Sequence, residues 1–171
     1  MVDKNVVDVA YATATSLGAT DKVMLALFEA GLVESDFENL NHGDLDSLGY
    51  LQQRASQGWP SPRDVPTATR SFVTRALTYE KNHPNVSAGA VAQGVQISAY
   101  PARYDMRAVE AKALISEAAS RSGKIVTTPV STTPVTPVTL TADLADVGER
   151  LLVGLAGLVI LSVGIYVMGK K

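Results

Sequence analysis

The chain has 171 residues, of which 46% are hydrophobic, enough for one globular domain and an appendage. Its formal net charge of −2 argues against a dedicated nucleic-acid-binding protein, so no nucleic-acid partner is expected. There is no cysteine, which excludes disulfides and thiolate chemistry, and His42 and His83 do not form a metal-ligand motif. We therefore expect no metal site and no cofactor.

The first predicted helix runs from Asp21 to about Ser35, with Thr20 as its N-cap. Its apolar side chains occupy two faces, so the helix is expected to lie at the centre of the fold. One face comprises Val23, Leu27, Ala30 and Glu34, and the other comprises Met24, Phe28 and Leu32. The polar segment 36–46 that follows is predicted to be a loop.

Three more helices are predicted after this loop, and no alternating pattern longer than a short hairpin indicates strands. They comprise Thr67 to about Lys81, Ala88 to about Ser98 with Ser87 as N-cap, and Asp105 to Ser122 with Met106, Val109, Ala113 and Leu114 facing inward. Residues 1–123 are therefore predicted to form one mainly α-helical domain.

A linker is predicted over residues 124–140, which are rich in proline, threonine, valine and serine. Pro129, Pro134 and Pro137 prevent a helix there and favour extended backbone. The linker leads into a third region, residues 141–171.

An apolar segment, residues 151–168, lies within this third region and contains no charged side chain. As a helix it would span about 27 Å, close to the thickness of the hydrocarbon core of a bilayer. We therefore expect a single membrane-spanning helix in contact with lipid; the alternative is a buried core helix or a coiled-coil helix. Lys170 and Lys171 follow the segment, which favours a cytoplasmic C-terminus.

Glu34, near the end of the first predicted helix, is the main candidate for chemistry. Burial disfavours the charged form of a carboxyl group, so the apolar helix is expected to raise the pKa of Glu34. A raised pKa suits a general acid that protonates a glycosidic oxygen near neutral pH. The alternative is an ordinary half-exposed glutamate near a helix C-terminus.

The segment 47–53 follows Glu34 at a spacing that suits the wall of a saccharide-binding cleft. Its glycine allows close backbone approach, and its two glutamines offer amide donors and acceptors to N-acetyl groups and sugar hydroxyls. The candidate binding residues are Ser47, Gly49, Tyr50, Gln52 and Gln53. Tyr50 and Trp59 are candidates for stacking on sugar rings, with core packing as the alternative for Trp59. Adjacent glutamines are otherwise ordinary surface residues.

Two further groups of side chains are candidates for the same cleft. Asp44 and Asp46 are candidates for the second carboxylate that glycosidases place roughly 5 to 9.5 Å from the first; the alternative is that both form turns. Further along the chain, Gln93, Gln96 and Tyr100 lie three or four residues apart and are candidates for a groove-facing surface. The alternative for Tyr100, as for Tyr104, is packing against the last helix.

Three strings, LVESDFENL, GDLDSLGYLQQRASQGW and AVAQGVQISAYPARYD, resemble the lysozyme-like domains of phages that infect actinobacteria, found alone or within tape-measure proteins. The order Glu-Ser, Gly-x-x-Gln and a tyrosine-bearing helix end is also similar to soluble lytic transglycosylases. The resemblance covers residues 24–115. It implies a lysozyme-like fold with Glu34 as general acid/base and with Gln52, Gln53 and Tyr100 as cleft residues. The string departs from the family pattern after the glutamines, with Ala55 in place of a frequent proline and Pro60 in place of glycine.

The resemblance implies a phage-associated enzyme that cleaves peptidoglycan glycan strands. The apolar segment, residues 151–168, lies outside the resemblance and adds the expectation of a membrane tether. A lytic transglycosylase needs only one glutamate, because the 6-hydroxyl of the substrate attacks, so this reaction is favoured over hydrolysis. The alternative is an inactive wall-binding or structural virion or tail component whose apolar segment enters a membrane, self-associates or contacts other virion proteins. The expected location is the host envelope or the virion, reached by delivery in the particle or as a tail anchor that leaves the domain in the cytoplasm.

Overall fold

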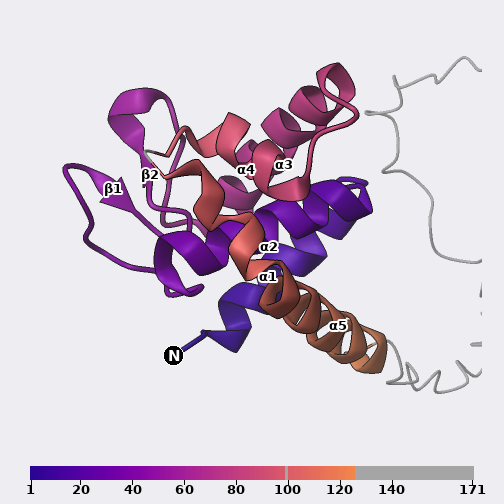
Figure 1. Ribbon diagram of the computed structural model, residues 1–171. Coiled ribbons are helices and arrows are strands. Elements are labelled where there is room, and N and C mark those ends of the chain that lie inside the picture. The colour runs from indigo at the N-terminus through magenta and orange to yellow at the C-terminus, as the bar shows by residue number, and fades with distance from the viewer. Residues whose placement is uncertain (99, 126–171) are drawn as a thin grey trace, which may run out of the picture. The chain divides into compact units, whose positions relative to one another are not determined.

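The computed structural model describes residues 1–98 and 100–125, and over these residues the chain is mainly helical (Figure 1). The α-helices are α1 (Lys4–Ser16), α2 (Asp21–Ser35), α3 (Val65–Asn82), α4 (Ala88–Gln96) and α5 (Ala108–Ile125). Between them lie the strands β1 (Ser47–Leu48) and β2 (Gln53–Arg54) and the short 3₁₀ helices η1 (Ala55–Gln57), η2 (Pro101–Arg103) and η3 (Asp105–Arg107).

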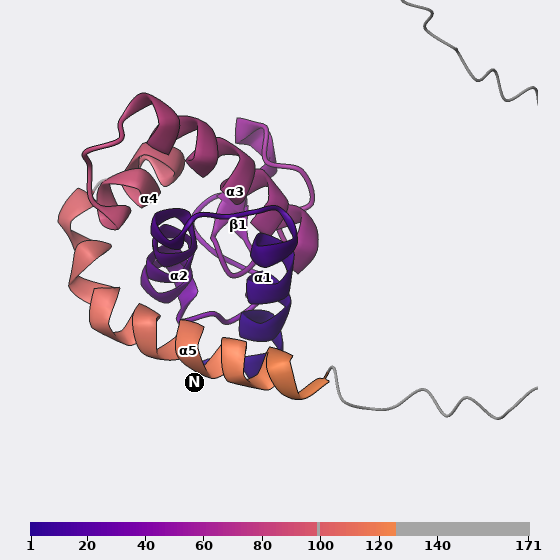
Figure 2. The ribbon, with the colours of Figure 1, turned by 90° about the vertical axis from the view of Figure 1, so that its right-hand side faces the viewer.

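Helix α2 is the central element, as its two apolar faces predict. It packs against α3, α4 and α5, and α1 completes the surrounding helices by packing on α3 and α5 (Figure 2). The Thr20 hydroxyl accepts a hydrogen bond from the Val23 amide, so the predicted N-cap and the predicted bounds of α2 are confirmed. Its buried residues are Val23, Met24, Ala26, Leu27, Phe28, Glu29, Ala30, Gly31 and Leu32.

The end of α2 is fixed by a reversal of the chain onto the helix. Asp36 and Phe37 both have left-handed backbone, with φ of 52° and 61°. The Phe37 ring thereby turns back onto the helix at Gly31, where any side chain larger than hydrogen would collide with it. Phe37 also packs against Phe28, with ring centroids 5.1 Å apart. The last turn of α2, which carries Glu34, is therefore held by the core.

The antiparallel hairpin β1–β2 pairs Ser47 with Arg54 and Leu48 with Gln53, in agreement with the expectation of only a short hairpin. Gly49 has a φ of 75° and lies directly against the Pro62 carbonyl, so both its backbone conformation and the space around it require glycine. The hairpin lies at the left in Figure 1.

The other helices agree with prediction in position but not in every detail. Helix α3 begins at Val65, two residues earlier than expected, and α4 ends at Gln96. The pattern did not single out α1, which Asp3 caps and whose Val6, Val7, Ala10 and Ala14 are buried.

The predicted inward face of the last helix is correct at Leu114 and wrong at Met106, Val109 and Ala113. Met106 and Val109 are strongly exposed and Ala113 is exposed, whereas Ala111 and Ala118 are buried and Leu114 and Ile115 pack on the core. The reason is that residues 105–107 form the separate 3₁₀ turn η3, which has a different period from the α-helix that follows.

The last helix continues to Ile125, two residues past the predicted end of the domain. Within residues 1–98 and 100–125, none of the helices combines the length and hydropathy that crossing a bilayer requires. The remainder of the predicted linker and the predicted span, residues 151–168, lie outside the described residues.

Candidate active site

The central contact of the candidate site joins Glu34 to Tyr104. The Tyr104 hydroxyl donates a hydrogen bond of 2.6 Å to Glu34 Oε1. Tyr104 lies between η2 and η3 and its side chain is fully buried, whereas Glu34 is half-buried. The contact therefore fixes one carboxylate oxygen from inside the protein, while Glu34 as a residue is still partly exposed.

The surroundings of Glu34 make it a weaker acid than an ordinary glutamate. Burial raises the pKa of Glu34, and the Tyr104 hydrogen bond and the nearby Arg103 charge offset part of this rise. Burial and the neighbouring carboxylate also raise the pKa of Tyr104, so its hydroxyl stays protonated and remains a donor. Glu34 thus provides a carboxyl group that can exchange a proton, and the Tyr104 hydroxyl, which keeps its proton, orients it.

The next residue, Ser35, joins the end of α2 to the hairpin. Its hydroxyl donates a 2.8 Å hydrogen bond to the Tyr50 carbonyl, which belongs to the turn between β1 and β2. The Tyr50 ring stacks on Phe37 with centroids 5.5 Å apart, and its hydroxyl lies 2.7 Å from the Thr69 hydroxyl. Tyr50 is completely buried, so the expectation that it stacks on a sugar is corrected: it anchors the turn to the core.

The predicted glutamines also hold the turn, each in a different way. Gln52 Nε2 donates to the Gly49 carbonyl at 2.9 Å, within the turn itself. Gln96 Nε2 donates to the Leu51 carbonyl at 2.7 Å and so joins the end of α4 to the hairpin. Their amide nitrogens are therefore engaged by the backbone.

Gln53 and Ser47, the other predicted wall residues on the hairpin, are buried. Gln53 is 2% exposed, and neither of its amide atoms has a hydrogen-bond partner among the described residues. Ser47 is 8% exposed. Both side chains lie beneath the surface of the hairpin, so direct contact with a sugar would require the hairpin to move.

Asp46, the candidate second carboxylate, is fully occupied by its neighbours. One oxygen accepts a 2.6 Å hydrogen bond from Arg54 Nε and another of 2.9 Å from the Ser56 hydroxyl, and the second oxygen accepts one from the Ser56 amide. These contacts hold the pKa of Asp46 well below its usual range. Asp46 stabilises the loop that follows the hairpin and is not free to act as the second carboxylate.

Tyr100 and Tyr104 have opposite placements. Tyr100 is exposed and lies under the Arg103 guanidinium, whose carbon is 5.9 Å from the ring centroid, whereas the buried Tyr104 contacts Glu34. Helical spacing did not distinguish the two tyrosines because Pro101 begins a 3₁₀ turn between them. The signal available in the sequence was the proline itself.

Glu29, also on α2, was not predicted as a special residue. Its side chain is completely buried, and neither carboxyl oxygen has a hydrogen-bond partner among the described residues. Burial raises the pKa of Glu29 to about 7, Asp105 adds to the rise, and Lys112 lowers it. The sequence signal was a charged residue inside a helix that is apolar on both faces.

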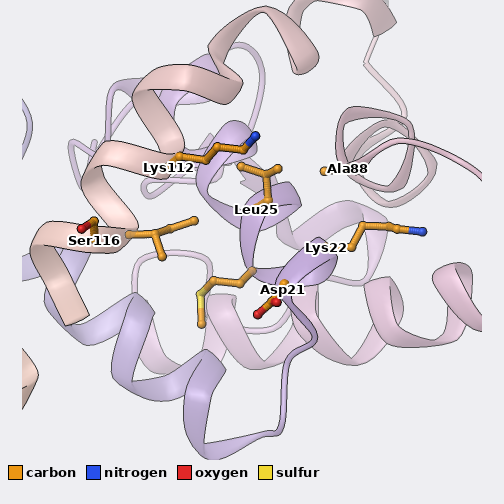
Figure 3. A pocket seen from close by; sticks show the side chains of 8 residues that line it. Asp21, Lys22, Leu25, Ala88, Lys112 and Ser116 are labelled. Carbon is orange, nitrogen blue, oxygen red and sulfur yellow. The ribbon is translucent and has the colours of Figure 1, made fainter.

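A cavity of about 440 Å³ lies among α2, the start of α4 and α5 (Figure 3). Its lining includes Leu25, Lys112 and Ile115. Leu25 and Glu34 are about 13 Å apart along the axis of α2, given the rise of an α-helix. The cavity is therefore not part of the Glu34 site.

No cluster of three or more histidine, aspartate or glutamate side chains able to hold a metal ion occurs in the part of the chain that the structure describes. No protein-family model matches the chain, and no curated protein is significantly similar to it.

Proposed function

We propose that the chain is a phage-associated, membrane-tethered enzyme that cleaves peptidoglycan glycan strands, with Glu34 as its only acid/base. The observation that carries this proposal is the Tyr104–Glu34 hydrogen bond at the end of a buried helix, next to a hairpin turn held by Ser35 and Gln96. A half-buried carboxyl with a raised pKa and a fixed orientation is suited to donating a proton and then taking one back.

The proposed reaction is that of a lytic transglycosylase. Glu34 protonates the glycosidic oxygen, and the bond from that oxygen to the anomeric carbon breaks. The resulting Glu34 carboxylate then accepts the proton of the 6-hydroxyl of the same muramyl residue, whose oxygen bonds to the anomeric carbon. A 1,6-anhydro sugar leaves, and Glu34 is again protonated. Only one carboxyl group is required, which agrees with the engagement of Asp46 by Arg54 and Ser56.

The tether in this proposal is the apolar segment 151–168, which would contact the lipid bilayer, with residues 124–140 setting the reach of the domain into the wall. Residues Lys170 and Lys171 favour a cytoplasmic C-terminus.

The second candidate function is a wall-binding or structural virion component with the same domain but no activity. It is favoured by the internal engagement of Gln52 and Gln96 and by the burial of Tyr50, which leave fewer groups for sugar binding than the sequence predicts. In that case the apolar segment would serve for membrane insertion, self-association or contact with other virion proteins.

The two candidates differ in whether Glu34 is required for release of soluble glycan. The full chain in detergent micelles should solubilise purified actinobacterial sacculi, and Glu34→Gln should abolish release. Glu117→Gln, which changes an exposed glutamate on α5 in the same way, is the matched control and should retain activity. No release by either the wild type or Glu34→Gln would assign the chain to the second candidate, and equal release by both would reject Glu34 as the acid.

A further inference from the structure

An exposed, mostly apolar surface borders the candidate site. It consists of Ile97, Tyr100, Arg103, Met106 and Val109, here called the exposed stripe. The four apolar members are 80%, 65%, 79% and 85% exposed, respectively, and Arg103 is exposed as well. Soluble proteins rarely expose several large apolar side chains along one segment, and such a group often marks an interaction surface.

The members of the exposed stripe are regularly spaced along the segment that joins α4 to α5. They are three residues apart, and η2 and η3 contain Arg103 and Met106. Both of these side chains are exposed to solvent. Tyr104, between them, points the other way into the core and to Glu34. The stripe is therefore the outer side of the segment whose inner side holds the acid.

Arg103 is the free cation of this surface. No carboxylate of the described residues forms an ion pair with it, and its guanidinium lies over the Tyr100 ring. Its charge acts on Glu34 directly enough to lower the pKa of that group. Arg107, the neighbouring arginine, is by contrast paired with Asp36 at 2.6 Å and with Glu110 at 2.9 Å. One arginine beside the acid is thus available to a ligand and the other is not.

The chemistry of the stripe matches one part of the proposed substrate. N-acetylated sugars are uncharged and bind through amides and hydroxyls, whereas the stem peptides that branch from the glycan strand carry free carboxylates next to small alkyl side chains. An exposed arginine near a tyrosine ring and aliphatic side chains fits a carboxylate on a short apolar peptide.

We infer that the exposed stripe binds the acidic stem peptide of peptidoglycan, with Arg103 pairing with a peptide carboxylate and Tyr100 and Met106 contacting the alkyl groups. The inference rests on the proposed function, because it takes the wall polymer as ligand. It predicts that the chain prefers glycan that carries free-acid stem peptides over glycan whose stem peptides are amidated.

The test measures binding separately from cleavage, by titration calorimetry on the full-length Glu34→Gln chain in detergent micelles. The probes are a disaccharide tetrapeptide and the same molecule with its peptide carboxyls amidated. A half-exposed ion pair corresponds to a preference of about three- to fivefold for the acid form. Arg103→Gln should reduce this preference to within about twofold, and Tyr100→Ala should weaken binding of both forms.

Lys81→Gln is the matched control, because it removes one exposed positive charge from the far end of α3 and should keep the preference. Equal affinity for the two probes, loss of the preference in Lys81→Gln as well, or no binding of either probe would overturn the inference.

Cleavage by the wild-type chain separates the two ideas. Sacculus cleavage without a preference for the acid probe retains the proposed function and rejects the inference. An Arg103-dependent preference for the acid probe without sacculus cleavage retains the inference and rejects the proposed function.

Discussion

The Tyr104 hydroxyl lies 2.6 Å from Glu34 Oε1, a contact between residues that are 70 positions apart in the chain. It joins the end of α2 to the segment between α4 and α5. It also gives the half-buried carboxyl a hydrogen-bond donor. The behaviour of Glu34 as an acid should therefore depend on Tyr104.

Tyr104→Phe removes this donor and keeps the ring. Because the hydrogen bond lowers the pKa of Glu34, its loss should raise that pKa, and the decline of activity with increasing pH should move to higher pH. The loss of orientation should lower kcat by about tenfold. The measurement is a pH–rate profile on purified sacculi. Tyr50→Phe loses a buried hydroxyl contact of similar length to Thr69, so an equal shift in that control would contradict the assigned role.

Glu29 should make stability depend on pH. Its pKa is raised from 4.5 to about 7, so between these values the folded protein binds the proton more tightly than the unfolded chain does. The free energy of unfolding should therefore fall as pH rises through this window, by an amount on the order of 3 kcal/mol, and then level off. Glu29→Gln should remove this part of the pH dependence.

Urea unfolding at a series of pH values measures this effect. Glu117→Gln, which alters a glutamate that is 55% exposed, should retain the wild-type dependence. If Glu29→Gln shows the same slope as wild type, Glu29 is not the titrating group.

Gln96→Ala should loosen the contact between α4 and the hairpin, because Gln96 donates to the Leu51 carbonyl. Loss of one such hydrogen bond costs about 1 kcal/mol. Amide hydrogen exchange should become faster in residues 49–54. Gln93→Ala removes an equivalent hydrogen bond, to the Ser98 carbonyl, but one that does not reach the hairpin. Faster exchange in both variants would argue against a specific link through Gln96.

Asp46→Asn distinguishes a structural carboxylate from a catalytic one. The variant should lower the melting temperature, because Arg54 and Ser56 lose their charged acceptor, and it should keep most of the activity at low temperature. The held-down pKa of Asp46 means that its contribution to stability is present at neutral pH and lost as the carboxylate becomes protonated in acid. Complete loss of activity in a folded Asp46→Asn protein would indicate that Asp46 is a second catalytic carboxylate.

The helical core was predictable where local signals agree. For α2, the Thr20 cap, the two apolar faces and the loop after Ser35 all indicate the same element, and the structure has the predicted bounds. The hairpin turn was recognisable from Gly49, whose φ of 75° only glycine adopts readily.

The prediction was wrong where the helical period changes. The 3₁₀ turns η2 and η3 alter which residues face inward, so Met106 and Val109 are exposed and Tyr104 is buried. A hydrophobic pattern also does not reveal side chains that are buried with their polar groups, as Tyr50 and Gln53 are. These residues were predicted on a surface because their chemistry suits sugars, but the fold uses them inside.

The central claim is that Glu34 cleaves glycan strands with the 6-hydroxyl of the substrate as nucleophile. Mass spectrometry of the products released from purified sacculi tests it most directly. Wild-type chain should release muropeptides with 1,6-anhydro ends, and Glu34→Gln should release none. Products with reducing ends would show that the reaction is hydrolysis and not transglycosylation. The same products from wild type and Glu34→Gln, or no products from either, would contradict the claim.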